Sequence, residues 1–369
     1  MTPPDKILII MTRRIGDVLL TTPLIRSLRR AWPQAQLDVL VFAGTEGVLQ
    51  GNPDINRILT VAQRPSFFTH LRFLAGLWRN YGLALSAVPG DRPTLYAFIA
   101  GRRCVGLLVE GKKHRWKKWL LSQWVPFDNV GTHTVLMHLK LAELLGVKPC
   151  YEVVTAWRQA DETQVRQLLP FDPSKQAYAV LHMYPMYAYK MWRRDAWVEL
   201  ARWLDTQGLR IVLSGGKSAD EMAYIANLLP SLPAETVNVA GKLSLGGVAL
   251  LLKQARAYVG PDTAVTHLAA ALGMPTVALF GPSNPVKWGP WPKGYEQDRN
   301  PYRMQGTQRV NNVVVLQGSG DCVPCMEEGC ERRITSLSDC LQSLPAASAI
   351  AALQELWRSM GEKQLIDNA

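Results

Sequence analysis

At 369 residues the chain is long for one domain and suits two domains of about 150 to 200 residues each. Hydrophobic residues make up 48% and charged residues 19%, a globular balance that is enough to fill two cores. The sequence has no uninterrupted apolar run of about 18 residues, which excludes a membrane-spanning helix of ordinary length.

The first residues, Met1 to Met11, have Lys6 ahead of a short apolar run and lack a small-residue cleavage site. The run favours a buried first strand over a signal peptide, so we expect the protein in the cytosol. The net charge of +11 is uneven: residues 1–150 hold 20 Lys and Arg against 9 Asp and Glu, whereas residues 151–369 hold 21 of each. A basic half beside a neutral half indicates an anionic partner, which charge alone leaves open between nucleic acid, acidic lipid and a phosphorylated substrate.

Apolar strands alternate with amphipathic helices, which predicts an α/β protein with two Rossmann-like halves in tandem. In the first half we predict strands at 6–11, 37–42 and 83–88, and a helix through Leu24, Ile25, Leu28 and Trp32. After a polar stretch at 158–167 we predict strands at 178–182, 209–214, 257–260 and 276–280. Helices are expected at 196–204 and 219–229, from 260 to a stop at Gly273, and at 346–360.

The segment Arg13-Arg14-Ile15-Gly16-Asp17 directly follows the first predicted strand. Gly16 permits a tight turn into a helix, which places Asp17 near the carboxyl end of the strand, the edge at which open α/β sheets bind ligands. The carboxylate of Asp17 can act there as a general base, or it can simply cap the helix. Position alone slightly favours the cap.

A second turn, 260–267, reads Gly-Pro-Asp-Thr-Ala-Val-Thr-His and lies between a predicted strand and a helix. The free backbone N–H groups and the helix dipole at such a turn suit a diphosphate. The alternative is that Asp262 or Thr263 only caps the helix and that His267 is a half-buried histidine whose hydrogen bonds are already made.

A third turn, Ser214-Gly215-Gly216-Lys217-Ser218, resembles a P-loop but has Ile211 where the leading glycine would stand. A Walker site is therefore not expected, although a glycine turn at a strand end can still admit a nucleotide. Lys190, among aromatic residues just past a predicted strand, can neutralise a phosphate or remain a solvated loop charge. The absence of Gly-x-Gly-x-x-Gly after any predicted strand argues against a dinucleotide dehydrogenase.

Taken in order, four segments resemble glycosyltransferase family 9, the ADP-heptose:lipopolysaccharide heptosyltransferases: residues 15–24, Lys190 with Trp192, the turn 214–216, and Asp262 to His267 followed by Gly281-Pro282-Ser283. The resemblance covers nearly the whole chain. It implies the GT-B fold, two facing Rossmann-like domains with a cleft between them. We accordingly expect an acceptor domain at 1–165, a nucleotide-sugar domain at 166–345 and a terminal helix at 346–369.

The resemblance implies inverting transfer of heptose from ADP-L-glycero-D-manno-heptose to the lipopolysaccharide inner core, with Asp17 as catalytic base and no cofactor needed for catalysis. The donor is expected to contact Lys190, Ser214, Gly215, Gly216, Leu243, Asp262, Thr263 and His267. Two alternatives stay open. One is the same fold with another donor sugar or a protein acceptor, and the other is a non-catalytic module that binds nucleic acid or membrane.

The sequence departs from the family pattern in two places. Arg13 and Arg14 stand where some members have small hydroxyl residues, which suggests a more anionic acceptor. Lys217-Ser218 stands where some members have an acidic residue after the glycine turn, which leaves open how the ribose or sugar hydroxyls are held.

Basic residues from 102 to 118 are interleaved with Trp116, Trp119 and Trp124. Such a segment suits a nucleic-acid groove, an anionic bilayer or a phosphorylated lipid A–core acceptor. Given the resemblance, we expect acceptor or inner-leaflet contact rather than a solvated face or nucleic acid, through Arg13, Arg14, Lys112, Lys113, Arg115, Lys117 and Lys118. The protein would then be peripheral to the inner face of the cytoplasmic membrane.

Four of the six cysteines cluster near the end of the chain, as Cys322-x2-Cys325-x4-Cys330-x9-Cys340. Six cysteines are too few for a disulfide scaffold of this length, and in a reducing compartment the spacing allows either a structural zinc or iron site or reduced bystander thiols.

Overall fold

The structure is a computed structural model that describes residues 3–366, with side chains as far as Met360. The chain forms two compact units: unit 1 comprises residues 1–156 and 296–300, and unit 2 comprises residues 157–295 and 301–369. Within the described residues, no helix has both the length and the apolar character needed to cross a membrane. The predicted domain ranges 1–165, 166–345 and 346–369 stay a prediction.

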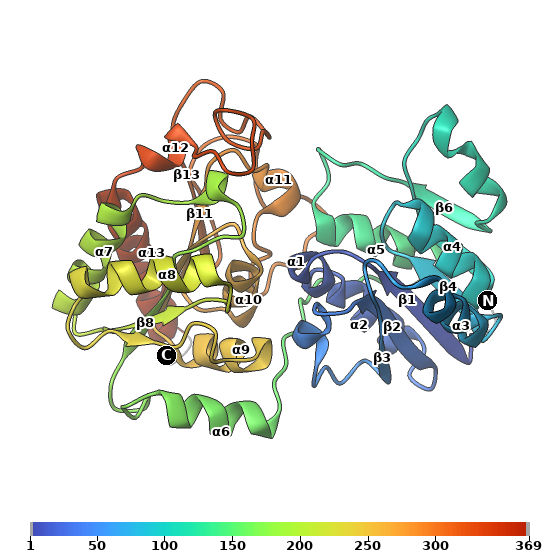
Figure 1. Ribbon diagram of the computed structural model, residues 1–369, viewed down its shortest axis with the longest axis horizontal. Coiled ribbons are helices and arrows are strands. Elements are labelled where there is room, and N and C mark those ends of the chain that lie inside the picture. Colours follow the sequence, from blue (N-terminus) through green and yellow to red (C-terminus); the bar gives the residue numbers. More distant parts are fainter. Residues whose placement is uncertain (1–2, 367–369) are drawn as a thin grey trace. The chain divides into compact units, whose positions relative to one another are not determined.

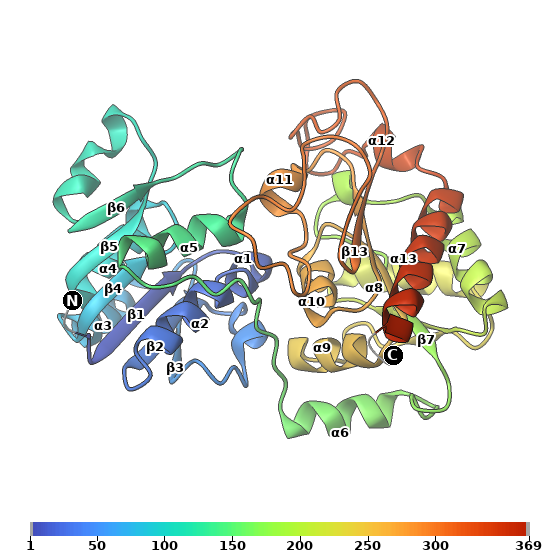
Figure 2. The same cartoon turned by 180° about the vertical axis from the view of Figure 1, so that it is seen from behind.

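Unit 1 is built on a fully parallel six-stranded sheet with the order β3-β2-β1-β4-β5-β6 (Figure 1). Its strands are β1 (Lys6–Met11), β2 (Gln36–Phe42), β3 (Arg57–Val61), β4 (Tyr81–Ser86), β5 (Gly101–Leu108) and β6 (Gln123–Pro126). Its helices are α1 (Ile15–Leu19), α2 (Thr22–Ala31), α3 (Phe67–Leu77), α4 (Asp91–Ala100) and α5 (Thr134–Leu144), with short 3-10 turns η1 (Glu46–Leu49) and η2 (Lys112–Trp119). Figures 1 and 2 show α3 and α4 on one face of the sheet and α2 and α5 on the other.

Unit 2 has a seven-stranded sheet with the order β12-β13-β11-β10-β7-β8-β9, in which only the edge strand β12 is antiparallel. Its strands are β7 (Tyr178–His182), β8 (Arg210–Ser214), β9 (Val237–Asn238), β10 (Ala257–Pro261), β11 (Thr276–Phe280), β12 (Gln308–Val310) and β13 (Val313–Gln317). Its helices are α6 (Gln159–Leu168), α7 (Arg194–Thr206), α8 (Ala219–Leu228), α9 (Leu245–Gln254), α10 (Ala264–Leu272), α11 (Pro285–Trp288), α12 (Asp339–Gln342) and α13 (Ala346–Ile366), with the 3-10 turns η3 (Ala188–Lys190) and η4 (Leu229–Ser231).

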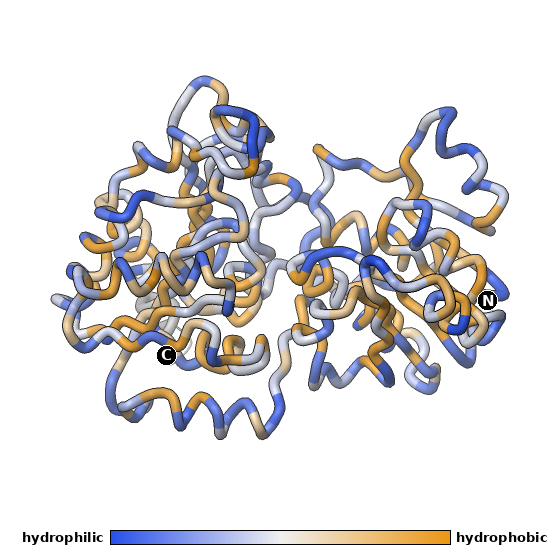
Figure 3. Tube along the Cα trace, in the orientation of Figure 1, coloured by the Kyte–Doolittle hydropathy of each residue, from blue (hydrophilic) through white to orange (hydrophobic). Residues whose placement is uncertain are grey.

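The central strands of both sheets are covered on both faces, and β1, β7 and β11 consist almost entirely of apolar residues (Figure 3). In β11, Val277 and Leu279 pack into the core that α7, α8 and α13 complete, whereas Ala278 and Phe280 pack into a separate cluster with α10. This two-sided burial produces the continuous apolar runs that mark these strands in the sequence.

The predicted strands at 6–11, 178–182 and 276–280 are confirmed, and the others are confirmed with shifts at their ends. Gly273 ends α10 in the left-handed conformation at φ 86°, as expected for a helix-stop glycine. The polar stretch at 158–167 is instead helical: it forms α6, at whose start the Asp161 carboxylate accepts the backbone N–H of Arg158 at 2.8 Å. Its polarity misled the prediction because only Asp161 and Val165 of this helix are buried.

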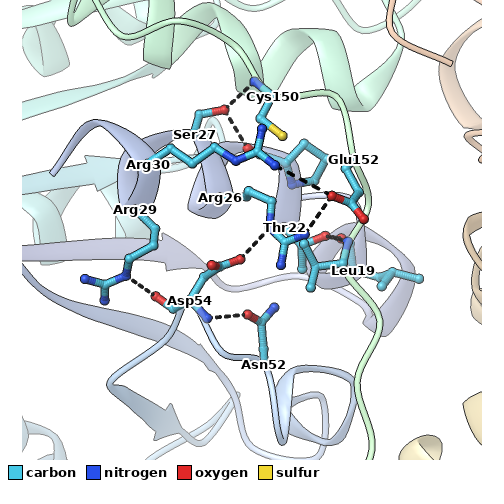
Figure 4. A network of polar contacts seen from close by, with 12 residues as sticks. Leu19, Thr22, Arg26, Ser27, Arg29, Arg30, Asn52, Asp54, Cys150 and Glu152 are labelled. Carbon is cyan, nitrogen blue, oxygen red and sulfur yellow. Dashed lines mark hydrogen bonds and ion pairs between the residues drawn. The ribbon is translucent and has the colours of Figure 1, made fainter. Parts of the chain in front are cut away.

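An arginine on α2 links three parts of unit 1 (Figure 4). Arg26 contacts Asp54, in the β2–β3 connection, with an Nε–Oδ2 distance of 2.8 Å, and Glu152, in the segment that leaves the unit, with an Nη1–Oε2 distance of 2.7 Å. The hydroxyls of Ser27 and Thr22 accept the backbone N–H groups of Cys150 and Val154. Together these bonds fix the position of α2, and with it the short helix α1 that precedes it.

We predict that Arg26→Met lowers the free energy of unfolding by about 2 kcal/mol, because it removes the cation that pairs with Asp54 and makes the shortest ion pair with Glu152. Urea titration followed by circular dichroism measures the change. Arg30→Met is the matched control, since Arg30 lies on the same helix at 4.0 Å from Glu152 but its side chain is 65% exposed. We expect the control to cost less than about 0.5 kcal/mol, and equal losses in the two variants would contradict the prediction.

Candidate active site

Asp17 lies in the first turn of α1, beyond the carboxyl end of β1, and its side chain is partly exposed. The N-cap position of α1 belongs to Arg14, so Asp17 is not the capping residue that its position in the sequence also allowed. The hydroxyl of Thr21 donates to the backbone carbonyl of Asp17 at 2.8 Å and joins α1 to α2. Arg13 and Arg14 are exposed beside it, so this edge of unit 1 combines a carboxylate with two cations.

In unit 2, Lys190 and Asp262 form an ion pair beyond the ends of two neighbouring strands. Lys190 ends η3 after β7, Asp262 follows β10, and the Nζ–Oδ2 distance is 2.6 Å. Burial by itself would raise the pKa of Asp262, but Lys190, together with His267 and a hydrogen bond from Ser283, holds the pKa below its usual value. Asp262 is therefore an ionised group whose charge is balanced, and its partner Lys190 keeps part of its side chain exposed.

His267 lies one helical turn into α10, with its Nε2 at 4.0 Å from Oδ1 of Asp262. Burial lowers its pKa to about 4, so at neutral pH the ring carries no charge. Its buried Nδ1 has no hydrogen-bond partner within the described part of the chain. A neutral ring with one unused nitrogen can make a hydrogen bond to a ligand but cannot balance the charge of a diphosphate.

The turn between β10 and α10 is held by hydroxyl groups. Thr263 occupies the N-cap position without a side-chain capping bond, and its hydroxyl lies 3.3 Å from that of Thr266. Thr266 also contacts the hydroxyl of Tyr258 at 2.8 Å and the carbonyl of Pro261. Because neither Asp262 nor Thr263 caps α10 with its side chain, the backbone N–H groups of the first turn remain available at this helix end.

The glycine turn at the end of β8 lies against a buried carboxylate. Glu221 of α8 is so close that a Cβ atom added to Gly215 would lie 2.5 Å from its Oε1, and one added to Gly216 would lie 2.9 Å from its Oε2. Burial raises the pKa of Glu221, while the backbone N–H of Gly216 opposes the rise. Oε1 is buried and has no hydrogen-bond partner among the described residues.

Glu221 is an acidic residue at this turn, where the sequence showed only Lys217-Ser218 directly after the glycines. A signal for it was present in the sequence: Ser218-Ala-Asp-Glu221 has the spacing of a capping box, which brings the third residue of a helix back to its start. Ser218 does cap α8, accepting the N–H of Glu221 at 3.4 Å. Ser214, at the end of β8, is buried against Nδ1 of His182 at 3.2 Å, and Leu243 packs against Gly247 just before α9.

The basic residues predicted for the acceptor do not share one environment. Lys112, Lys113, Arg115 and Lys118 are exposed on η2. Lys117 is buried and pairs with Asp91 at the start of α4, with an Nζ–Oδ1 distance of 2.6 Å. The charge of Lys117 is thus used to anchor η2 to unit 1.

The four clustered cysteines do not assemble the predicted metal site. In the described part of the chain, no three His, Cys, Asp or Glu side chains are placed to hold a metal ion, and Cys322, Cys325, Cys330 and Cys340 are all free thiols. Three of them are exposed on an irregular loop, and Cys330 accepts the N–H of Asp339 at 3.3 Å. Burial, followed by the neighbouring Cys325, raises the pKa of Cys340 to about 11, so this thiol is protonated at neutral pH.

Comparison with known proteins agrees with this fold. Residues 94–314 match the model of glycosyltransferase family 9 (heptosyltransferase), which is more than half of the chain. The chain belongs to glycosyltransferase family 9.

Among its relatives, lipopolysaccharide heptosyltransferase 3 of Escherichia coli K12 is 28% identical over 75% of this chain and 82% of that protein. Lipopolysaccharide heptosyltransferase 1 of Pseudomonas aeruginosa is 28% identical over 88% of this chain and 87% of that protein. The solved structure of E. coli ADP-heptose lipopolysaccharide heptosyltransferase II covers 96% of this chain and 99% of its own, with a TM-score of 0.74 at 19% identity. A family 9 glycosyltransferase from Veillonella parvula gives a TM-score of 0.75 over 95% of this chain and 97% of its own, at 18% identity. The predicted GT-B fold is thereby confirmed.

For a family 9 glycosyltransferase, the two units offer complementary chemistry. Unit 1 has a partly exposed carboxylate that can accept a proton, and unit 2 has a cation, a helix N-terminus and a buried carboxylate around one sheet edge. The buried Glu221 oxygen suits hydroxyl donors and the helix end suits phosphate oxygens, so the arrangement in unit 2 suits a nucleotide.

We predict that acid destabilises unit 2 through its two buried histidines. Burial lowers the pKa of both His182 and His267 to about 4, whereas the pKa of a histidine in the unfolded chain is about 6.5. As the pH falls from 6.5 to 4 the unfolded chain binds protons that the folded chain does not, so each ring costs about 2 kcal/mol between pH 7 and pH 5.

Urea titrations at the two pH values test this. His182→Gln should lower stability at pH 7 but reduce the loss on going to pH 5 by about 2 kcal/mol. Leu200→Ala, in the core of the same unit, should lower stability equally at both values. An unchanged pH-dependent loss in His182→Gln would show that this ring is not the source.

Proposed function

We propose that this protein transfers a heptose from ADP-L-glycero-D-manno-heptose to the inner core of lipopolysaccharide, at the cytoplasmic face of the inner membrane. The observation that carries the proposal is the pairing of Lys190 with Asp262 beside a helix N-terminus at the end of β10, in a chain of family 9. Its relatives, lipopolysaccharide heptosyltransferases 1 and 3, indicate the sugar and the acceptor.

Unit 2 is proposed to bind the donor. The diphosphate would lie at the first turn of α10, where backbone N–H groups and Thr263 face it, and Lys190 would exchange part of its contact with Asp262 for a phosphate oxygen. The ribose hydroxyls would donate to the unpaired Oε1 of Glu221 at the glycine turn 214–216. Leu243, half-buried ahead of α9, would contact the base.

Unit 1 is proposed to bind the acceptor, with Asp17 as the general base. The carboxylate takes the proton of an acceptor hydroxyl as that oxygen forms its bond to the anomeric carbon of heptose. The bond from that carbon to the diphosphate oxygen breaks on the opposite side, so configuration inverts and ADP leaves with the electron pair. Arg13 and Arg14 flank Asp17 and suit a phosphorylated acceptor.

The developing charge on ADP is balanced by groups of the chain itself. Lys190 supplies a full positive charge, the α10 N-terminus supplies its dipole, and the neutral His267 supplies a hydrogen bond through the nitrogen that is unused in the structure. We accordingly propose that the donor binds and reacts without a magnesium ion.

We predict that Asp17→Asn lowers kcat by about 10²- to 10⁴-fold, because it removes the proton acceptor while keeping the size of the side chain. Turnover is measured as ADP release from ADP-heptose with a core acceptor, and ADP affinity should stay within about twofold of the wild type. Glu46→Gln is a matched control, because Glu46 also lies in the first turn of a helix after a strand of the same sheet. Near-normal turnover of Asp17→Asn would show that Asp17 is not the general base.

We predict that Glu221→Gln weakens ADP binding by about tenfold through the loss of a charged hydrogen-bond acceptor for ribose. Calorimetry is done with ADP and with 2′,3′-dideoxy-ADP, with magnesium and with EDTA. The variant and the wild type should bind the dideoxy ligand equally, and affinities should not depend on magnesium.

Asp220→Asn controls for charge on the same helix, because Asp220 is exposed next to Glu221 in the first turn of α8. An equal effect of Glu221→Gln on both ligands would argue against the ribose contact. No binding of ADP or ADP-heptose to the wild type would overturn the proposed donor site as a whole.

A further inference from the structure

The exposed aromatic side chains of this protein are unevenly distributed. Within the described residues, every exposed Phe and Trp lies in unit 1, and the most exposed are Phe67 (74%), Phe68 (81%) and Trp119 (88%). In unit 2 the exposed large apolar side chains are Met186, Met326, Ile334 and Leu337. The aromatic exposure is thus a property of one unit, and its most exposed members lie on α3 and η2.

Helix α3 is apolar on two faces, but only one of them is packed. Phe73, Leu74 and Leu77 contact the core that α4 and the sheet complete. Phe67, Phe68 and Leu71 lie at the start of the helix on its other face, and the two Phe rings contact each other edge to face at 5.6 Å. A soluble helix ordinarily turns polar residues to this side, so the exposed face indicates a partner.

The exposed start of α3 is linked to η2 through two consecutive residues of α4. Asp91 binds the buried Lys117 of η2 at 2.6 Å. Arg92 donates to the carbonyls of Gln63 and Ala62, at 2.7 and 2.8 Å, in the segment that leads into α3. The segment that leads into α3, and η2 with Trp116 and Trp119, are therefore two flanks that the start of α4 joins.

Both flanks are strongly basic. Residues 62–80 contain three Arg and no Asp or Glu, and residues 111–124 contain five Lys and Arg and likewise no Asp or Glu. Lys112, Lys113, Arg115 and Lys118 are exposed, and Lys118 lies over the ring of Trp124 at 5.0 Å. Figure 3 shows η2, beside β6, as a hydrophilic stretch. Aromatic rings surrounded by cations are the side chains that proteins place at an anionic membrane surface.

The surface lies at the sheet edge that carries Asp17. The β4 strand runs parallel to β1, with Ser86 paired to Ile10, so both strands end at the same edge. Helix α4 follows β4 there, as α1 with Asp17 follows β1. An acceptor whose acyl chains remain in a bilayer would meet this edge first.

We propose that Phe67 and Phe68 of α3, with Trp116 and Trp119 of η2, insert into the interfacial layer of an anionic bilayer while the η2 cations contact lipid phosphates. A second copy of the chain is disfavoured as the occupant, because a symmetric contact would bring two basic surfaces together. The inference rests on the proposed function for its biological setting, but it concerns binding and not transfer. It adds an apolar anchor on α3 to the basic segment that the sequence indicates.

Vesicle co-sedimentation of the full chain tests the proposal, with vesicles of phosphatidylcholine containing one third phosphatidylglycerol, and without donor or acceptor. The wild type should bind these vesicles and not pure phosphatidylcholine. Phe67→Ser combined with Phe68→Ser should weaken binding by at least about tenfold, because each ring contributes interfacial burial. Met186→Ser combined with Ile334→Ser, exposed apolar residues of unit 2, should leave binding unchanged.

Brominated lipids provide a second readout, because they quench an indole that enters the bilayer. Trp119→Phe should lose a measurable part of the quenching seen in the wild type. Circular dichroism of each variant shows that loss of binding is not loss of folding. Kinetics with a delipidated core acceptor should be unchanged in the Phe67 and Phe68 variant.

The outcomes separate this inference from the proposed function. The inference is overturned if the wild type does not bind phosphatidylglycerol vesicles, or if the Phe67 and Phe68 variant binds them normally. Either result holds whatever the transferase activity is. A dimer that dissociates in that variant would identify a second copy as the occupant and would also overturn it. Phe-dependent vesicle binding by a protein without heptosyl transfer would sustain the inference and refute the proposed function.

Discussion

The chemistry of this protein depends on one constraint, that parallel strands bring their carboxyl ends to a common edge. In both sheets the first strand of the unit lies beside the fourth: β1 is next to β4, and β7 is next to β10. The connections leave such a central pair in opposite directions, which opens room for a ligand. In unit 1, Asp17 follows β1. In unit 2, Lys190 follows β7 and Asp262 follows β10. In each unit the sheet topology alone therefore places these groups at the carboxyl edge of its sheet.

At the edge of the unit 2 sheet, burial determines which side chains are charged. Asp262 can remain ionised because Lys190 lies against it, and removing either would leave the other as an uncompensated charge. The same low polarity keeps His267 neutral and leaves polar atoms of His267 and Glu221 without partners in the described chain. Buried atoms without partners cost free energy, and proteins tolerate this cost where a ligand completes the hydrogen bonds.

The sequence predicted β1, β7 and β11, because a short continuous apolar run between turn residues is typical of a strand that helices cover on both sides. It did not predict the buried strands β5 and β13, nor α6 and the edge strands β9 and β12, whose short or polar segments depend on neighbours for their conformation. At the candidate site, the turn residues were indicated by position, whereas contacts across the sheet were not. The ion pair of Lys117 with Asp91 joins residues of distant segments, and only the fold shows that this lysine is buried.

The uneven charge of the chain agrees with the proposed assignment of the acceptor to unit 1 and the donor to unit 2. The excess of cations lies in residues 1–150, which form the bulk of unit 1, and the exposed aromatic residues lie there as well. Unit 2 is close to neutral, with 20 Lys and Arg against 18 Asp and Glu, and the proposed donor site offers one lysine and a helix end. A small soluble donor needs only such a local site, because it diffuses to the protein. A lipid-linked acceptor stays in an anionic surface, so long-range attraction and an apolar anchor are useful only on the unit that meets it.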